Sequence, residues 1–211
     1  MRFDDLRRAY RVGSLGPDDL ADDPLELLTT WLERAAAAGE PEPNAMALAS
    51  VAADGRPSVR FVLLKEVTPA GLTFFTNYES RKARELDGSG AAAVALWWPV
   101  LERQVRVEGS VERVTRATSE AYFGSRPRGS QLGAWTSPQS RPLADRAELE
   151  SRAAAVAARF EGGAVPCPPH WGGYLLRPER VEFWQGRDDR LHDRFLYSLE
   201  GAAWSLTRLA P

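Results

Sequence analysis

Three cationic side chains near the C-terminus have the spacing of a binding row. Arg190, His192 and Arg194 are each separated by one residue. On a β-strand, alternate side chains point to the same face, so we expect these three to lie side by side. Two guanidinium groups and an imidazole repel one another unless water screens them or an anionic ligand lies across them. The row therefore predicts either an anion site or a solvated edge strand.

The segment from Thr76 to Lys82 joins a predicted strand end to a predicted helix start. Ser80 is a suitable N-cap for that helix, and Arg81 and Lys82 follow it directly. Backbone N–H groups and the dipole at a helix N-terminus favour an anion, and the two cations add fixed charge. Basic residues in a first turn oppose the dipole, which a purely structural helix would avoid. A phosphate site and a solvated helix start are both consistent with this segment.

The strand-like run from Arg60 to Lys65 has a cation at each end and four apolar residues between them, Phe61, Val62, Leu63 and Leu64. By strand parity the two cations face opposite sides of the sheet. Both reach one ligand only if a β-bulge intervenes or the ligand wraps the strand end. Otherwise the run is a sheet edge protected by charge.

Other polar and aromatic residues are suited to a flat, phosphorylated ligand. Gln104 lies in a strand otherwise made of valine and charged residues, where it either bonds the edge of a heterocycle or is solvated. Residues 122–131 include an aromatic ring, two guanidinium groups and hydroxyls, which suit a second phosphate. Residues 135–140 supply amide and hydroxyl groups, and Trp184 is able to cover a flat ring.

Composition excludes several other classes of function. The chain has 211 residues, of which 44% are hydrophobic and 27% charged, as expected of one globular domain. A net charge of −2 argues against a bulk nucleic-acid or membrane-surface binder. Cys167 is the only cysteine and there are only two histidines, so we expect no internal disulfide and no metal site. P-loop, GxGxxG and GxSxG motifs are absent.

The hydropathy pattern predicts a cytoplasmic protein. Residues 1–10 are charged and lack the apolar core of a signal peptide. No apolar run reaches the length of about 18 residues that a transmembrane helix needs.

Periodicity and turn residues predict the elements that position these side chains. Residues 1–22 read as a flexible N-terminal arm, and residues 23–211 as a single domain. Helices are predicted at 24–38, from Ser80 to a stop at Gly88, at 118–123 and at 145–160, with an irregular loop at 124–141. Strands are predicted at 46–51, 58–67, 72–76, 91–97, 101–114, 173–176, 181–184, 191–197 and 203–209, with a bulge at Gly109. The expected fold is α+β, mainly an antiparallel β-barrel with peripheral helices.

Eight motifs follow one another in order along nearly the whole chain. They are Arg60-Phe-Val-Leu-Leu-Lys65, Thr76-Asn-Tyr-Glu-Ser-Arg-Lys82, Leu101-Glu-Arg-Gln-Val105, Tyr122-Phe-Gly-Ser-Arg-Pro-Arg128, Gln139-Ser140, Val181-Glu-Phe-Trp-Gln-Gly186, Arg190-Leu-His-Asp-Arg-Phe195 and Arg208-Leu-Ala-Pro211. Together they resemble the motifs of the pyridoxine/pyridoxamine 5′-phosphate oxidase family. The first two also occur more loosely in other flavin-binding split barrels, whereas the last two are typical of the oxidase.

The resemblance implies an FMN-binding split β-barrel that forms a homodimer through a C-terminal dimerisation region. It implies oxidation of pyridoxine or pyridoxamine 5′-phosphate to pyridoxal 5′-phosphate in vitamin B6 biosynthesis and salvage, with O₂ reduced to H₂O₂. FMN would be bound by Arg60, Phe61, Val62, Leu63, Leu64, Lys65, Phe75, Thr76, Arg81, Lys82, Gln104, Gln139, Ser140, Trp184 and Arg194. Substrate would be bound by Arg7, Tyr10, Lys65, Tyr122, Arg126, Ser130, Arg190, Leu191 and His192, with Arg190 and His192 as the catalytic pair.

Two positions depart from the family pattern. Ala9 stands where an acidic arm residue is expected, and Glu42 where an aspartate is expected near the substrate. Both bear on how the arm would close over the substrate. Two alternative functions are a split-barrel reductase using FMN or the deazaflavin F420, which would not need Arg190 and His192, and a non-catalytic carrier of flavin or pyridoxal phosphate.

Overall fold

The structure, a computed structural model, describes residues 9–211 of the chain. Its strands are β1 (Ala45–Val51), β2 (Pro57–Thr68), β3 (Gly71–Asn77), β4 (Ala91–Trp98), β5 (Arg103–Arg113), β6 (Trp171–Gln185), β7 (Asp193–Glu200) and β8 (Ala203–Arg208). Its α-helices are α1 (Pro24–Ala37), α2 (Arg81–Ser89), α3 (Arg116–Ser125), α4 (Arg128–Thr136) and α5 (Arg146–Arg159), joined by the short 3₁₀ helices η1 (Pro17–Asp19) and η2 (Asp188–Arg190).

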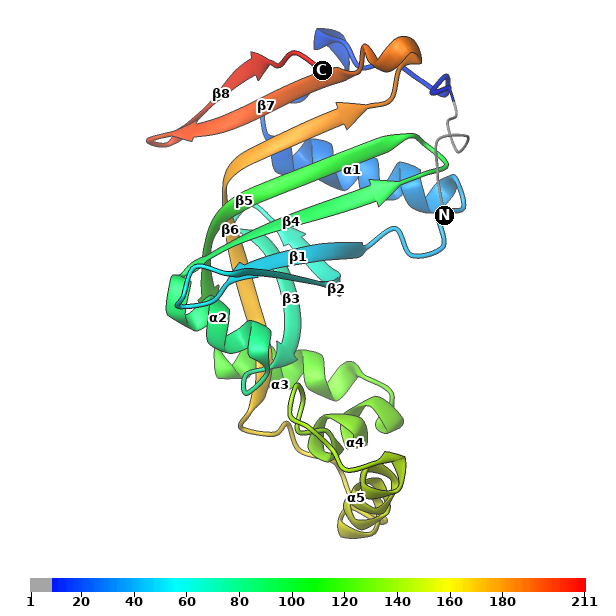
Figure 1. Cartoon of the computed structure of the whole chain (residues 1–211), viewed down its shortest axis with the longest axis vertical. Coiled ribbons are helices and arrows are strands. Elements are labelled where there is room, and N and C mark those ends of the chain that lie inside the picture. Colours follow the sequence, from blue (N-terminus) through cyan, green and yellow to red (C-terminus); the bar gives the residue numbers. More distant parts are fainter. Residues whose placement is uncertain (1–8) are drawn as a thin grey trace.

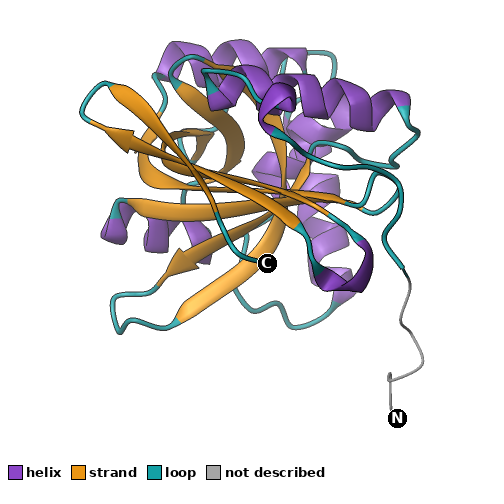
Figure 2. Ribbon diagram, turned by 90° about the horizontal axis from the view of Figure 1, so that it is seen from above, coloured by secondary structure: helices purple, strands orange, loops and turns teal. Residues whose placement is uncertain are grey.

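Six antiparallel strands close into a barrel. The sheet order is β3-β2-β1-β4-β5-β6-β7-β8, and an additional pairing of β3 with β6 closes the ring, leaving β7 and β8 as an extension (Figure 1). Seen from above, the curved strands cross the middle of the view, and helices lie both beside and behind them (Figure 2). The α+β split barrel expected from the sequence is therefore confirmed.

The long strand β6 belongs both to the barrel and to the β7–β8 extension. Its first part pairs with β3, from Trp171 opposite Asn77 onward, and its last part pairs with β7. The sequence predicts two separate strands here, which is wrong, because the chain continues through Pro178. Pro178 lies opposite Gly109, where the β5–β6 register shifts, and a proline is tolerated at such a bulge.

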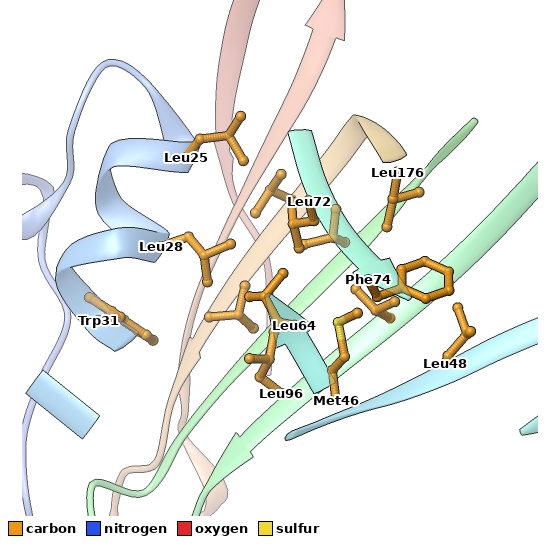
Figure 3. Close-up of a cluster of buried hydrophobic side chains, with 14 of the residues drawn as sticks. Leu25, Leu28, Trp31, Met46, Leu48, Leu64, Leu72, Phe74, Leu96 and Leu176 are labelled. Carbon is orange, nitrogen blue, oxygen red and sulfur yellow. The ribbon is translucent and has the colours of Figure 1, made fainter. Parts of the chain in front are cut away.

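Helix α1 packs against the barrel interior. As predicted, Asp23 is its N-cap, and its carboxylate accepts the N–H of Leu25 at 2.7 Å. Leu25, Leu28 and Trp31 are buried and point toward core residues of the strands, which Figure 3 labels as Met46, Leu48, Leu64, Leu72, Phe74, Leu96 and Leu176. Burying each such side chain contributes about 1.5–3 kcal/mol, so this contact fixes the helix to the sheet.

Two helix predictions need correction. Helix α2 begins at its predicted cap, Ser80, but it ends at Gly90 and not at Gly88, because Gly90 adopts the left-handed conformation of a helix end (φ 67°). The predicted loop at 124–141 contains α4, whose two glycines lower its intrinsic helix propensity. Tertiary contacts stabilise it instead: the Trp135 indole N–H donates to the carbonyl of Pro166 at 2.8 Å.

The described part of the arm, residues 9–22, lies against the barrel. Leu15 is buried, and its N–H donates to the carboxylate of Asp193 at 3.1 Å. The N–H of Val12 donates to Glu102 at 2.9 Å. The division into an arm (1–22) and a domain (23–211) stays a prediction. Among residues 9–211, no helix has the length and apolar character needed to cross a membrane.

Candidate functional site

A cavity of about 580 Å³ lies among β2, β3 and helices α2–α4. This volume is in the usual range for small-ligand sites. Many of the residues predicted for cofactor or substrate line it: Phe61, Val62, Leu63, Lys65, Phe75, Thr76, Lys82, Tyr122, Arg126, Ser130 and Gln139. The sequence motifs therefore predict most of the polar lining of this cavity.

A bulge brings Lys65 to the cavity. Leu64 pairs with Phe74 and Glu66 with Thr73, so Lys65 is an extra residue in β2. Lys65 lines the cavity, whereas Arg60 at the other end of the run does not. The predicted bulge is therefore present, but it does not bring both cations to the cavity, because Arg60 lies outside the lining.

Lys82 supplies a partly buried cation to the lining of the cavity. Its ammonium donates to Gln139 at 2.7 Å and to the Thr76 hydroxyl at 3.1 Å, and both partners are neutral. Burial, and then the nearby charge of Arg60, lower the pKa of Lys82 to about 8. An anionic ligand would stabilise this ammonium.

Glu85 on α2 holds two further cations near Lys82. Its carboxylate accepts from Arg81 at 2.7 Å, from Arg60 at 3.2 Å, and from the hydroxyls of Ser50 and Ser58 at 2.6 and 2.5 Å. Burial alone would raise the pKa of Glu85, but these hydrogen bonds outweigh it and lower the pKa to about 2. Glu85 therefore stays ionised and fixes both guanidinium groups.

Arg126 supplies a cation on the α3–α4 side of the cavity. Its guanidinium lies over the Trp171 ring at 4.6 Å, and burial lowers its pKa. Its Nη1 atom is buried and has no hydrogen-bond partner among the residues that the structure describes. The ring of Tyr122, which also lines the cavity, stacks on Phe75 with centroids 4.0 Å apart. A buried donor without an acceptor is rare, and an anionic ligand would satisfy it.

A second group of predicted residues lies on the outer face of β4–β7. Strand register puts Trp97, Gln104, Trp184 and Arg194 directly opposite one another in a row across four strands. Residues paired in this way share one face of a sheet. Aromatic, amide and guanidinium groups are thus aligned beside the loop that carries His192.

The predicted strand row of Arg190, His192 and Arg194 is wrong in part. Asp189 and Arg190 adopt left-handed backbone conformations (φ 56° and 63°), so the chain turns in η2 and β7 begins only at Asp193. Only Arg194 lies on the strand. His192 packs instead on Trp184, with ring centroids 4.6 Å apart.

Tyr10 of the arm covers this loop. Its ring makes edge contacts with Trp184 at 5.8 Å and with His192 at 5.7 Å. A side chain at Gly186 would collide with the Tyr10 ring, so that glycine permits the close approach. Arg7, the other predicted arm residue, lies outside the described residues.

The remaining predicted residues do not line the cavity. Leu64 is buried in the core, Arg81 is exposed and paired with Glu85, and Ser140 and Leu191 are exposed. Several lining residues were missed, namely Asn77, Pro127, Gly133, Ala134, Ser137 and Trp171. Asn77 directly follows the predicted strand that ends at Thr76, so its position could have been predicted, whereas nothing in the sequence signals that Trp171 would stack beside Tyr122.

The cavity and the outer row lie on different strands of one chain. The cavity is lined from β2 and β3, whereas the row begins on β4, which β1 separates from β2, and extends to β7. The outer face carries exposed apolar side chains at both places, namely Val59, Phe61 and Leu63 on β2 and Trp97 on β4. An apolar face of this kind is typical of an interface.

Comparison with known proteins identifies the family. Residues 32–160 match the model described as pyridoxamine 5′-phosphate oxidase, and residues 171–211 match that of the pyridoxine 5′-phosphate oxidase C-terminal dimerisation region. The chain is 53% identical to the pyridoxine/pyridoxamine 5′-phosphate oxidase of Rubrobacter xylanophilus, covering 98% of this chain and 95% of that protein. It is 55% identical to that of Thermosynechococcus vestitus, covering 100% and 99%.

Solved structures agree with this result. PhzG from Burkholderia lata, in complex with tetrahydrophenazine-1-carboxylic acid, superposes with a TM-score of 0.88 at 36% identity, over 93% of this chain and 98% of PhzG. An FMN-binding protein from Nostoc punctiforme superposes with a TM-score of 0.72 at 18% identity, over 91% of this chain and 100% of that one, which supports the fold alone. The chain belongs to the pyridoxamine 5′-phosphate oxidase family.

Proposed function

We propose that this protein oxidises pyridoxine 5′-phosphate or pyridoxamine 5′-phosphate to pyridoxal 5′-phosphate, with FMN as its flavin and O₂ as the electron acceptor. Relatives that are more than half identical over nearly the full length carry the name of this oxidase. The observation that carries the proposal is the set of cations that line the cavity from different elements. Lys65 of β2, Lys82 of α2 and Arg126 at the end of α3 all line it, and Nη1 of Arg126 has no partner within residues 9–211.

Cations from separate elements suit two phosphorylated ligands. The FMN phosphate would be bound at Lys82, with Arg60 and Arg81 held behind it by Glu85. Charged and bidentate donors are the strongest phosphate ligands. The predicted FMN contacts that line the cavity would bind the rest of the cofactor; they are Phe61, Val62, Leu63, Lys65, Phe75, Thr76 and Gln139.

The substrate phosphate would be bound at Arg126. Lys65, Tyr122, Arg126 and Ser130 all line the cavity. Arg126 is already desolvated against Trp171, so a phosphate would gain a full charge-assisted hydrogen bond at the buried Nη1. This group of residues fits the phosphate that both B6 substrates carry.

The protein's own task is to orient the two rings and to supply charge. When bound, FMN supplies the redox chemistry by accepting a hydride from C4′ of the substrate at its N5 atom. Trp184 and Gln104 offer a stacking surface and an amide for the flat rings, and Arg194 and Arg190 supply positive charge beside them. Holding both rings in contact geometry lowers the entropic part of the reaction barrier.

A complete site requires a second copy of the chain. The residues proposed to bind one stacked pair of rings lie in two groups on different strands, and the outer face of the sheet that carries them has exposed apolar side chains. Two-fold packing of that face would bring the cavity of one protomer to the row of its partner. The match to a C-terminal dimerisation region supports a homodimer.

Oxygen consumption tests the proposal. Purified protein should be yellow, release FMN on denaturation, and consume O₂ when given either phosphorylated vitamer, with pyridoxal 5′-phosphate as product. The non-phosphorylated vitamers should be far poorer substrates, because Arg126 then has no anion to bind. Protein that binds flavin but turns over neither phosphorylated substrate would support a carrier, and colourless protein that takes up no flavin would exclude the proposal.

A further inference from the structure

The elbow between α3 and α4 carries the groups proposed to bind the substrate phosphate. Only two residues, Arg126 and Pro127, join the two helices. Tyr122 comes from the last turn of α3 and Ser130 from the first turn of α4, and both line the cavity with Arg126. A movement of this elbow would therefore displace all three side chains together.

The side-chain amide of Gln131 bonds the elbow from within α4. Its Nε2 atom donates to the backbone carbonyls of Phe123 at 3.1 Å, of Gly124 at 3.3 Å and of Arg126 at 3.1 Å. An amide nitrogen has two hydrogens, so the three carbonyls share two N–H groups. Carbonyls at the C-terminal end of a helix have no intrahelical partner, and here Gln131 supplies one. One side chain of α4 thus holds the end of α3.

The backbone of Arg126 is fixed at both of its polar groups. Its N–H donates to the carbonyl of Phe123 at 3.2 Å, and its own carbonyl accepts from Gln131. Pro127 follows, and a proline restricts the conformation of the residue before it. From this backbone the guanidinium reaches the Trp171 ring at 4.6 Å, where Nη1 is buried and meets no acceptor in the described chain. The cation is thus positioned before an anion binds.

We infer that Gln131 is a positioning residue for substrate binding, because its amide holds the elbow in the conformation that presents Arg126 and Ser130 to the substrate phosphate. Gln131 does not line the cavity, so it acts through Arg126 and not by contact with the ligand. This inference rests on the proposed function for the identity of the phosphate ester. A site that is fixed in advance loses less conformational entropy on binding, which raises its affinity.

The variant Gln131→Met tests the inference, because methionine has a similar shape and no N–H donor. Without these hydrogen bonds the binding-competent elbow becomes a minor part of the population, so the KM for pyridoxine 5′-phosphate should rise about five- to tenfold. The kcat should stay within about twofold, because the phosphate takes no part in the reaction and is bound equally in the ground and transition states. The kcat/KM for non-phosphorylated pyridoxine should not change.

Arg128→Met is the matched control on the same helix. The Arg128 guanidinium also donates to backbone carbonyls, of Gly163 at 2.7 Å and of Phe160 at 2.5 Å, but these belong to the segment that follows α5. Arg128 does not line the cavity, so its loss should lower stability and leave both KM values unchanged. A Gln131→Met variant that slowed both vitamers equally, or that kept the wild-type KM for the phosphorylated one, would overturn the inference.

Calorimetric titration separates this inference from the proposed function. The probe is 4′-deoxypyridoxine 5′-phosphate, which has no oxidisable group at C4′, so no turnover occurs. Its dissociation constant should rise about five- to tenfold in Gln131→Met and stay unchanged in Arg128→Met. Wild-type protein that binds the probe but oxidises neither vitamer would refute the proposed function alone. Equal affinity of the wild type and Gln131→Met would refute this inference alone, and a wild type that does not bind the probe would refute both.

A second variant covers the case in which Gln131→Met is too unstable to purify. Gln131→His keeps one ring N–H at a similar reach, so it should retain part of the bonding to the elbow. Its loss of affinity for the probe should be smaller than that of the methionine variant and again confined to phosphorylated ligands. A histidine variant with wild-type stability and a loss shared by pyridoxine would contradict the positioning role.

Discussion

At the scale of single residues, two of the cations that line the cavity, Lys82 and Arg126, are paired with no anion among the described residues. The ammonium of Lys82 donates to neutral oxygens at 2.7 and 3.1 Å, and Nη1 of Arg126 is buried without a partner in the described chain. Each arrangement costs stability that a structural protein would have no reason to retain. Both are explained if phosphates bind there.

The lowered pKa of Lys82 predicts a pH dependence of FMN binding. In the apoprotein, burial and Arg60 lower that pKa to about 8, so the ammonium loses its charge as the pH rises through 8. The FMN phosphate, with a second pKa near 6, stays dianionic throughout. The affinity of apoprotein for FMN should therefore fall about tenfold between pH 7 and pH 9, as measured by quenching of flavin fluorescence.

Two variants control this pH experiment. Lys82→Arg keeps its charge over the whole range, and Lys82→Met has none, so both should bind FMN with a nearly flat profile. A wild-type profile as flat as theirs would mean that Lys82 does not meet the phosphate.

At the scale of elements, the sequence predicted most helices and strands because their signals are local. The cap at Asp23, the hairpin between β1 and β2 and the bulge at Gly109 all depend on residues within a few positions of one another. Helix α4 and the turn in η2 were missed for the opposite reason. Trp135 of α4 bonds Pro166, 31 residues away, and Asp193, which pairs with Arg187 beside η2, is bonded by Leu15, 178 residues away.

The same distinction applies to the candidate site. Lys65, Lys82 and Arg126 could be predicted because their charge is visible in the sequence, at the end of an apolar run for Lys65 and beside predicted helix ends for Lys82 and Arg126. Glu85 could not, because its role depends on Ser50 and Arg60, which reach it only through the sheet. No pattern within α2 distinguishes it from a solvated helix carboxylate.

The bulge in β5 gives a prediction at the element scale. A Cβ atom added at Gly109 would lie 1.9 Å from the carbonyl oxygen of Arg177, a backbone atom that cannot move without separating β5 from β6. Gly109→Ala should therefore lower the free energy of unfolding by on the order of 3 kcal/mol, measured by urea denaturation.

Gly88→Ala is the matched control for that experiment. Gly88 lies within α2 and a Cβ there meets nothing within 4 Å, so alanine should stabilise the helix by up to about 1 kcal/mol. If the two substitutions changed the free energy of unfolding by equal and small amounts, the close approach of β5 and β6 at Gly109 would not be required for stability.

At the scale of the whole molecule, the exposed apolar face of β2, β1 and β4 is expected to be the dimer interface. Val59 is 69% exposed on this face and does not line the cavity. Val59→Arg should give a monomer by analytical ultracentrifugation and weaken FMN binding, because the partner's row is lost. Ala36→Arg, an exposed position on α1, should leave the dimer and the flavin unchanged. A Val59→Arg variant that stays dimeric and yellow would exclude this face.

The measurement that tests the whole account most directly is complementation between two inactive variants. Arg126→Ala removes the cavity's phosphate ligand and Arg190→Ala removes a cation of the loop, so each homodimer should oxidise pyridoxine 5′-phosphate poorly. If each site combines the cavity of one protomer with the loop of its partner, co-expressed variants form mixed dimers with one intact site. With random mixing, about half of the dimers are mixed and each of these has one of its two sites intact. Co-expression should then restore about a quarter of wild-type O₂ consumption. Recovery no greater than the average of the two homodimers would contradict a shared site.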